Sequence, residues 1–287
     1  MGLLQGISEL FPVSSLGHSV LIPALLGWHN LVNSQSSSQS FFLAFVVGLH
    51  VGTAVGLIAY YRHTWSTIGR GLVTQLQWTR TRGIRSLWQL RDPSMDANYR
   101  LLVMLALGTI PVGLAGIVFD RELRVLFAKP LAAAIFLTLN GVVLLLGERW
   151  RRHQGRHAAH VKLGVLTARS ALAIGSAQIL ALFAGFSRSG SAITAGLLGG
   201  LSHEDAANFS FLLATPVILL AGLYKLPDLM GPLGNGVRVQ TFVGALFAMV
   251  AAYAAVRFLL RWFTTRTLVP FGMYSVVLGL LCVVRFA

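Results

Sequence analysis

Long apolar runs alternate with shorter polar and basic segments along this chain. A run that approaches the roughly 20 residues needed to cross a hydrocarbon layer about 30 Å thick predicts a transmembrane helix. We therefore expect a polytopic membrane protein with six spans. The runs are Phe41 to Tyr61, Leu101 to Phe119, Leu131 to Gly147, Phe209 to Leu226, Thr241 to Leu260 and Leu268 to Val284.

Two other apolar segments are too interrupted to be clean spans. Prolines and a glycine interrupt Leu3 to Gly27, and glycines around Ser187 and Arg188 interrupt Ala171 to Gly200. Proline removes a helical hydrogen bond and clashes with the preceding turn, so a helix ends there. We predict that each segment forms a re-entrant helix hairpin, which brings the total to about ten helices.

The two hairpins also resemble each other in sequence. Ser14-Ser15-Leu16-Gly17 aligns with Ser187-Arg188-Ser189-Gly190, and the same offset pairs Gln5 with Gln178. Because three spans separate the hairpins, the second half is expected upside down relative to the first. This is the inverted-repeat plan, in which interrupted helices meet near the membrane midplane. Chance similarity between segments rich in glycine and alanine is the rival explanation.

The predicted fold class is accordingly an all-α polytopic membrane protein. Each half consists of one re-entrant hairpin and three transmembrane helices. A single integral membrane domain covers residues 1–287, with repeats at about 1–148 and 170–287 joined by a basic cytoplasmic loop.

Composition agrees with this interpretation. Apolar residues make up 55% of the 287 residues, charged residues make up only 11%, and the mean hydropathy is +0.71. Soluble domains have about 25% charged residues, so an ordinary water-soluble fold is excluded. The single cysteine, Cys282, excludes an intrachain disulfide and a cysteine metal site.

The net charge of +14 reflects membrane topology rather than a nucleic-acid partner, because the cations gather between apolar spans. The segments Arg62 to Arg100 and Arg149 to Arg169 are expected to be cytoplasmic loops, and Asp120 to Arg124 an outer loop. The inner cations are Arg70, Arg80, Arg82, Arg85, Arg91, Arg151, Arg152, Arg156, Lys162, Arg257, Arg261 and Arg266.

The first hairpin carries several polar residues that lipid does not tolerate alone. An ionisable side chain at membrane depth costs a few kcal/mol, so Glu9 needs a partner or a water-filled cavity. Helical spacing puts Gln5 and Glu9 on one face and Ser15 beside His18. These residues predict a functional site. The alternative is that Glu9 faces water at the membrane interface.

The second hairpin encloses a cation among small residues, since Arg188 lies between serines and glycines. Glycines allow close approach of backbone amides, a helix N-terminus adds positive potential, and a guanidinium matches phosphate oxygens. We predict an anion site. The alternative is that Arg188 reaches lipid headgroups.

Histidines elsewhere offer weaker signals. His153, His157 and His160 have helical metal-ligand spacing but lie in a basic segment, which favours a solvated face. His50 falls within the first span, where it is expected to face the protein interior and to serve as a partner of the site.

The two polar segments resemble the signature motifs of the bacterial undecaprenyl-pyrophosphate phosphatases, the bacitracin-resistance family, written E-G-x-T-E-F-L-P-x-S-S-T-G-H and P-G-x-S-R-S-G. The similarity continues at Gly108-Thr109-Ile110-Pro111, Glu148-Arg149 and Phe209 to Pro216. It implies hydrolysis of undecaprenyl pyrophosphate in the bacterial inner membrane, a divalent cation such as Mg²⁺ or Ca²⁺, and a site open to the outer face.

The resemblance also implies roles for individual residues. Glu9, Ser15, His18 and Arg188 form the implied catalytic set, with Ser15 the expected attacking oxygen and direct attack by His18 left open. Glu9 is the implied metal ligand, and Gln5, which replaces the signature's first glutamate, a weaker second one. The implied substrate-binding residues are Gln5, Ser14, Gly17, Ser187, Ser189, Gly190, Ser191 and Thr194.

Two other functions stay open at the level of sequence. An inverted-repeat transporter or lipid flippase would use Arg188 for an anionic headgroup and Glu9 for a proton. Ser15 beside His18 favours an enzyme, because transport needs no nucleophile. A non-catalytic homologue is the third possibility, raised by Gln5. A polyprenyl pyrophosphate and membrane lipids are the expected partners, and the sequence leaves open whether the chain forms a homodimer.

Overall fold

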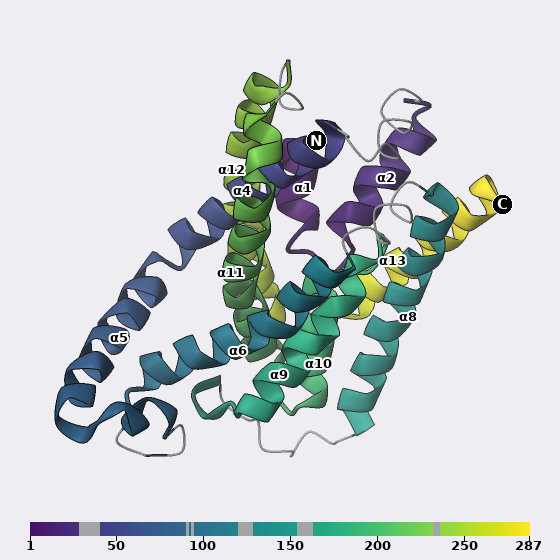
Figure 1. Ribbon diagram of the computed structural model, residues 1–287. Coiled ribbons are helices and arrows are strands. Elements are labelled where there is room, and N and C mark those ends of the chain that lie inside the picture. Colours follow the sequence, from purple (N-terminus) through teal and green to yellow (C-terminus); the bar gives the residue numbers. More distant parts are fainter. Residues whose placement is uncertain (29–40, 90–91, 93–94, 120–128, 154–162, 232–235) are drawn as a thin grey trace.

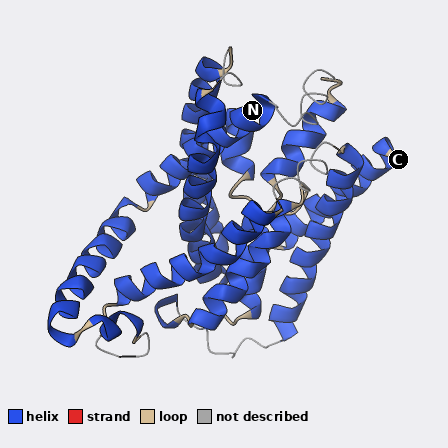
Figure 2. Cartoon of the chain, in the orientation of Figure 1, coloured by secondary structure: helices blue, strands red, loops and turns tan. Residues whose placement is uncertain are grey.

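The computed structural model describes the chain except for residues 29–40, 90–91, 93–94, 120–128, 154–162 and 232–235. The described part consists of helices and connecting loops, without strands (Figure 2). The α-helices are α1 (Gly2–Ser8), α2 (Ser15–Leu25), α4 (Phe41–Tyr60), α5 (Arg62–Arg82), α6 (Ala97–Val118), α8 (Pro130–His153), α9 (Ala168–Ala177), α10 (Arg188–Leu198), α11 (His203–Met230), α12 (Arg238–Phe263) and α13 (Val269–Phe286). Three 3-10 helices are η1 (Ile84–Trp88), η2 (Leu163–Val165) and η3 (Gln178–Leu182).

The predicted number of spans is confirmed within the described residues. Five helices, α6, α8, α11, α12 and α13, are long and apolar enough to cross a membrane. The bent pair α4 and α5 supplies a sixth candidate, with an angle of 77° between its two parts. Each observed span overlaps the apolar run that predicted it, and the ends differ by at most six residues.

The expectation of a loop from Arg62 to Arg100 is wrong, because most of this segment is helical. Helix α5 continues α4 after the bend and projects from the bundle (Figure 1). Its buried face includes Ile68 and Gln75, and the Gln75 Nε2 donates to the Ser86 carbonyl over 3.1 Å. The frequent arginines lower the hydropathy of this amphipathic helix, so a search for apolar runs does not find it.

Some residues of the two predicted cytoplasmic loops are helical, and others lie outside the described part of the chain. Part of the second basic loop is also helical, because α8 extends to His153 and carries Arg151 and Arg152 in its last turn. The residues named in the loop predictions that fall outside the described part are Arg91, Asp120, Arg121, Glu122, Arg124, Arg156, His157, His160 and Lys162.

Both interrupted segments form hairpins. Helices α1 and α2 enter from one end of the molecule, whereas α9, η3 and α10 enter from the opposite end, and their turns meet near the centre (Figure 1). Each hairpin packs against a span of the other half, α1 against α12 and α9 against α6. An inverted arrangement of two halves predicts this exchange of packing partners. The boundaries of the repeats stay a prediction.

Small residues allow these helices to approach closely. A Cβ atom placed on Gly175 of α9 would collide with the backbone of Gly108 in α6. In the same way, Gly6 of α1 lies against the backbone of Ala248 in α12. Such close approach of backbones is how helices associate where lipid removes the hydrophobic driving force.

We expect Gly175→Val to destabilise the protein by about 1–3 kcal/mol, because the added methyl groups overpack the contact with α6. Gly113→Val is the matched control, since nothing lies within 4 Å of a Cβ placed there in α6. The measurement is the thermal unfolding midpoint of the purified protein in detergent. Equal midpoints for the two variants would contradict the close approach of α9 and α6.

Candidate functional site

Two serines cap the helices that leave the hairpin turns. Ser14 caps α2 and accepts a hydrogen bond from the Gly17 N–H over 3.1 Å. Ser187 caps α10 and accepts from the Gly190 N–H over 3.0 Å. The structure thus repeats in space the alignment of the two motifs in sequence. Both helices begin at the site, where their N-termini contribute partial positive charge.

The same serines bind the two hairpins to each other. The Ser14 hydroxyl also accepts from the Gly185 N–H over 3.2 Å, across the hairpin boundary. On the other hairpin, Ser187 and Ser189 donate to the Phe11 carbonyl over 3.5 and 3.3 Å. These serines were predicted to bind substrate. In this structure their hydroxyls hold the two turns together.

Close backbone contact completes this junction. A Cβ atom placed on Gly17 would lie only 3.0 Å from the Cα of Gly185. Gly185 has a φ of +114°, a conformation that side chains rarely adopt. Glycine at both positions therefore lets the turns touch, and the predicted substrate-binding residue Gly17 has a structural role here.

Asn140 of α8 connects both hairpins, although the sequence analysis did not single it out. Its Nδ2 donates to the Pro12 carbonyl over 3.1 Å, and its Oδ1 accepts from the Ser187 N–H over 3.0 Å. A further contact of 3.4 Å joins Nδ2 to Ser275 of α13. The side chain is buried. The sequence could have pointed to Asn140, because it is a lone amide inside an apolar span and polar groups at membrane depth need partners.

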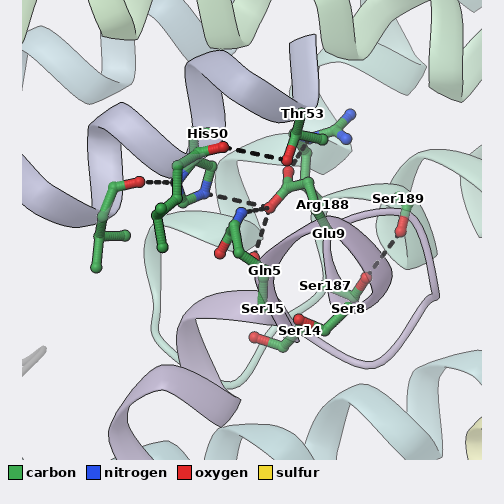
Figure 3. Close-up of polar contacts among 12 residues, drawn as sticks. Gln5, Ser8, Glu9, Ser14, Ser15, His50, Thr53, Ser187, Arg188 and Ser189 are labelled. Atoms are coloured by element: carbon green, nitrogen blue, oxygen red, sulfur yellow. Dashed lines mark hydrogen bonds and ion pairs between the residues drawn. The ribbon is translucent and has the colours of Figure 1, made fainter. Parts of the chain in front are cut away.

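Glu9 lies at the centre of the polar cluster (Figure 3). Its Oε2 accepts hydrogen bonds from the Gln5 Nε2 over 3.1 Å and from the Ser15 hydroxyl over 2.5 Å. Its Oε1 accepts from the Arg188 Nε over 3.2 Å, and the His50 Nε2 lies 3.2 Å from Oε2. The carboxylate is only 6% exposed, so it is a buried anion with charged and polar partners on both oxygens.

Arg188 reaches Glu9 from the second hairpin and keeps one donor group free of described partners. Its NH1 contacts the Gln178 Oε1 at 3.5 Å and the Ser210 carbonyl at 3.4 Å. Its NH2 is buried and has no hydrogen-bond partner among the described residues. A guanidinium nitrogen in this situation is suited to an anionic oxygen, since unpaired buried donors are costly.

His18 lies one turn after Ser15 in α2, as the spacing predicted, but its ring nitrogens have other partners. Its Nδ1 donates to the Ser14 carbonyl over 2.7 Å, and its Nε2 lies 2.8 Å from the Tyr274 hydroxyl. The imidazole also stacks on the Tyr274 ring, with centroids 5.8 Å apart. Among the described residues, no hydrogen bond joins His18 to Ser15 or Glu9. The imidazole that contacts Glu9 is that of His50.

The remaining predicted residues lie further along α10. The hydroxyls of Ser191 and Thr194 are buried and have no hydrogen-bond partner among the described residues. Thr194 packs against Gly147 of α8, more than one turn beyond Arg188. A role for either hydroxyl in substrate binding stays a prediction.

Of the three histidines with metal-ligand spacing, His157 and His160 lie outside the described part of the chain. His153 is exposed, and the part of the chain that the structure describes holds no group of three His, Cys, Asp or Glu residues placed for a metal ion.

The fold and the site define a class of integral membrane protein in which two half-membrane hairpins enclose a buried acid, a hydroxyl and a guanidinium. More specifically, the chain belongs to the family described as bacitracin resistance protein BacA, whose sequence profile matches residues 1–281. The chain is 47% identical to undecaprenyl-diphosphatase 2 of Frankia alni, over 100% of this chain and 96% of that protein. It is also 47% identical to the undecaprenyl-diphosphatase of Mycolicibacterium paratuberculosis, over 97% of this chain and 93% of that protein.

We expect Asn140→Leu to lower the free energy of unfolding by about 2–4 kcal/mol, because it leaves the Pro12 carbonyl and the Ser187 N–H unpaired. Thr138→Val is the matched control in α8, since the Thr138 hydroxyl donates to the Ala134 carbonyl of its own helix. Thermal unfolding in detergent measures the difference. Faster hydrogen exchange around Ser187 should accompany it, and unchanged exchange there would be evidence against the bridging role.

Proposed function

We propose that the chain hydrolyses undecaprenyl pyrophosphate to undecaprenyl phosphate and inorganic phosphate. The identity to proteins named undecaprenyl-diphosphatase, over nearly the full length of both chains, supports this assignment. The observation that carries it is the contact of Ser15 with Glu9 beside Arg188. A hydroxyl bonded to a buried acid is suited to nucleophilic attack, and an adjacent guanidinium is suited to a phosphoryl group.

The reaction divides into two steps in this proposal. The Ser15 oxygen attacks the terminal phosphorus while Glu9 Oε2 takes the serine proton, and the bond to the bridging oxygen breaks, releasing undecaprenyl phosphate. Water then attacks the phosphorus of the phosphoserine and the P–O bond to Ser15 breaks. Glu9 returns its proton to the Ser15 oxygen, and inorganic phosphate leaves with the oxygen and protons of the water. The hydrogen bonds of His18 to Ser14 and Tyr274 favour Ser15 over His18 as the nucleophile.

Positive charge at the site stabilises the transferred phosphoryl group. Arg188 NH2 is buried without a described partner and is suited to bind a phosphate oxygen. The N-termini of α2 and α10 add partial positive charge from two directions. These three sources act among buried side chains, where electrostatic interactions are stronger than in water.

A divalent cation such as Mg²⁺ is part of the proposal, and the residues fit it. The Gln5 Oε1 is buried and has no hydrogen-bond partner among the described residues, so it offers a neutral oxygen ligand beside the Glu9 carboxylate. Magnesium ions are commonly held by one or two carboxylates together with substrate phosphates. When bound, the ion would neutralise charge on phosphate oxygens.

The proposed location is the bacterial inner membrane, with the site open to the outer face. The basic segments after α4 and at the end of α8 support a cytoplasmic position for those helix ends. The prenyl tail would lie in lipid between the spans, whose outward residues are apolar.

We expect Ser15→Ala to reduce phosphate release from farnesyl or undecaprenyl pyrophosphate by about 10³-fold or more, because the attacking oxygen is lost. Arg188→Lys should reduce it by about 10²-fold, because the planar donor pair is lost. The control is Ser176→Ala, an exposed serine of α9. Full activity of Ser15→Ala would refute the assigned nucleophile, and no release from the intact protein would favour the transporter alternative.

The proposed orientation predicts which positions are reached from each side of the membrane. In a Cys282→Ala background, Val239→Cys at the start of α12 should react with an impermeant maleimide in intact spheroplasts. Arg85→Cys should react only after permeabilisation, because it lies in the cytoplasmic basic segment. The reverse pattern would contradict the orientation.

A further inference from the structure

His50 is the imidazole that contacts the Glu9 carboxylate, and no role in the reaction has been assigned to it so far. It lies on the spanning helix α4, with its Nε2 3.2 Å from the Glu9 Oε2 (Figure 3). Its Nδ1 lies 2.8 Å from the Val46 carbonyl, one turn earlier on the same helix. The side chain is 18% exposed.

The Val46 contact fixes the orientation of the ring. A carbonyl oxygen only accepts hydrogen bonds, so the His50 Nδ1 carries a proton and donates it. The opposite ring nitrogen, Nε2, faces the Glu9 carboxylate, which also only accepts, so it carries a proton as well and the ring is an imidazolium. The ring is therefore held by the backbone of α4 on one side and contacts the carboxylate on the other.

The carboxylate needs such a contact, because its terminal torsion has no sharp rotamer preference. Gln5 also donates to Oε2, but it belongs to α1, the same seven-residue helix that ends beside Glu9. Helix α4 is a separate, longer helix that packs along α11 and α12. The contact from His50 therefore ties the position of the Glu9 Oε2 to the transmembrane helices.

Oε2 is also the oxygen that accepts the Ser15 hydroxyl. Nucleophile, base and a third group that orients the base form a recurrent arrangement in hydrolases. We propose that His50 is a positioning residue, which holds the Glu9 Oε2 against Ser15 in the geometry of proton transfer. This inference rests on the proposed phosphatase function. His18 cannot take the same part, since both of its ring nitrogens have other partners.

Two amide substitutions separate this role from a merely structural one. In His50→Gln the side-chain nitrogen reaches approximately the position of Nε2, so an N–H can still be donated to Glu9. In His50→Asn the shorter amide can serve the Val46 carbonyl but does not extend to Glu9. Both variants are polar and smaller than or similar to histidine, so both are compatible with the packing of α4. His63→Asn, at an exposed position of α5, is the matched control.

The experiment measures phosphate release, thermal unfolding and binding of a non-hydrolysable methylene analogue of farnesyl pyrophosphate. We expect His50→Asn to lower kcat by about 10²-fold, since misplacing a reacting group by about 1 Å costs that much. KM and the analogue Kd should stay within about twofold. His50→Gln should recover most of the lost kcat at the same unfolding midpoint.

Other results would overturn the inference. Wild-type kcat in His50→Asn would show that Glu9 needs no orientation from α4. Equal losses in His50→Asn and His50→Gln, together with lowered unfolding midpoints, would assign a structural role instead. A raised KM and Kd at unchanged kcat would make His50 a substrate contact. If the wild-type protein releases no phosphate, both this inference and the proposed function are overturned. If the wild type is active and His50→Asn is equally active, only this inference is overturned.

Discussion

The ion pair between Glu9 and Arg188 is the constraint on which the rest of the structure depends. Glu9 directly follows the short helix α1 and Arg188 begins the short helix α10, and both side chains are almost fully buried. Removing one partner of a buried pair costs about 3–5 kcal/mol, because the other charge is left uncompensated. The two hairpins, 179 residues apart at this contact, are therefore stable in the membrane only when they are folded against each other.

The remaining contacts of the site make this approach possible. Backbone groups at the hairpin turns have no water to bind, so each needs a partner within the protein. Ser14, Ser187 and Asn140 supply these partners, and each joins segments that are distant in sequence. Hydroxyls that a motif search assigns to ligand binding are thus largely used to hold the turns. The positive groups left for a ligand are the Arg188 NH2 and the two helix N-termini.

Sequence was sufficient for the features that depend on composition or local rules. Apolar length predicted the spans, proline and glycine predicted the interrupted hairpins, and the expense of a lone charge in lipid singled out Glu9 and Arg188. Helical spacing did not reveal the partners of the His18 ring, because one of them is Tyr274, a residue 256 positions away. The role of Asn140 likewise depends on where two turns meet. Such contacts depend on how distant segments pack together, and the spacing of residues along one helix gives no information on that packing.

The replacement of the signature's first glutamate by Gln5 changes the charge balance of the site. A glutamate at this position would place a second carboxylate within hydrogen-bond distance of Glu9, where two negative charges repel unless a cation or a proton lies between them. Gln5 instead donates an N–H to Glu9 over 3.1 Å. The acid is then paired with the His50 imidazole and with the Arg188 guanidinium, which uses its Nε and leaves NH2 without a described partner. The substitution therefore removes a charge that a cation would otherwise have to balance, while the Gln5 carbonyl oxygen is kept as a neutral ligand.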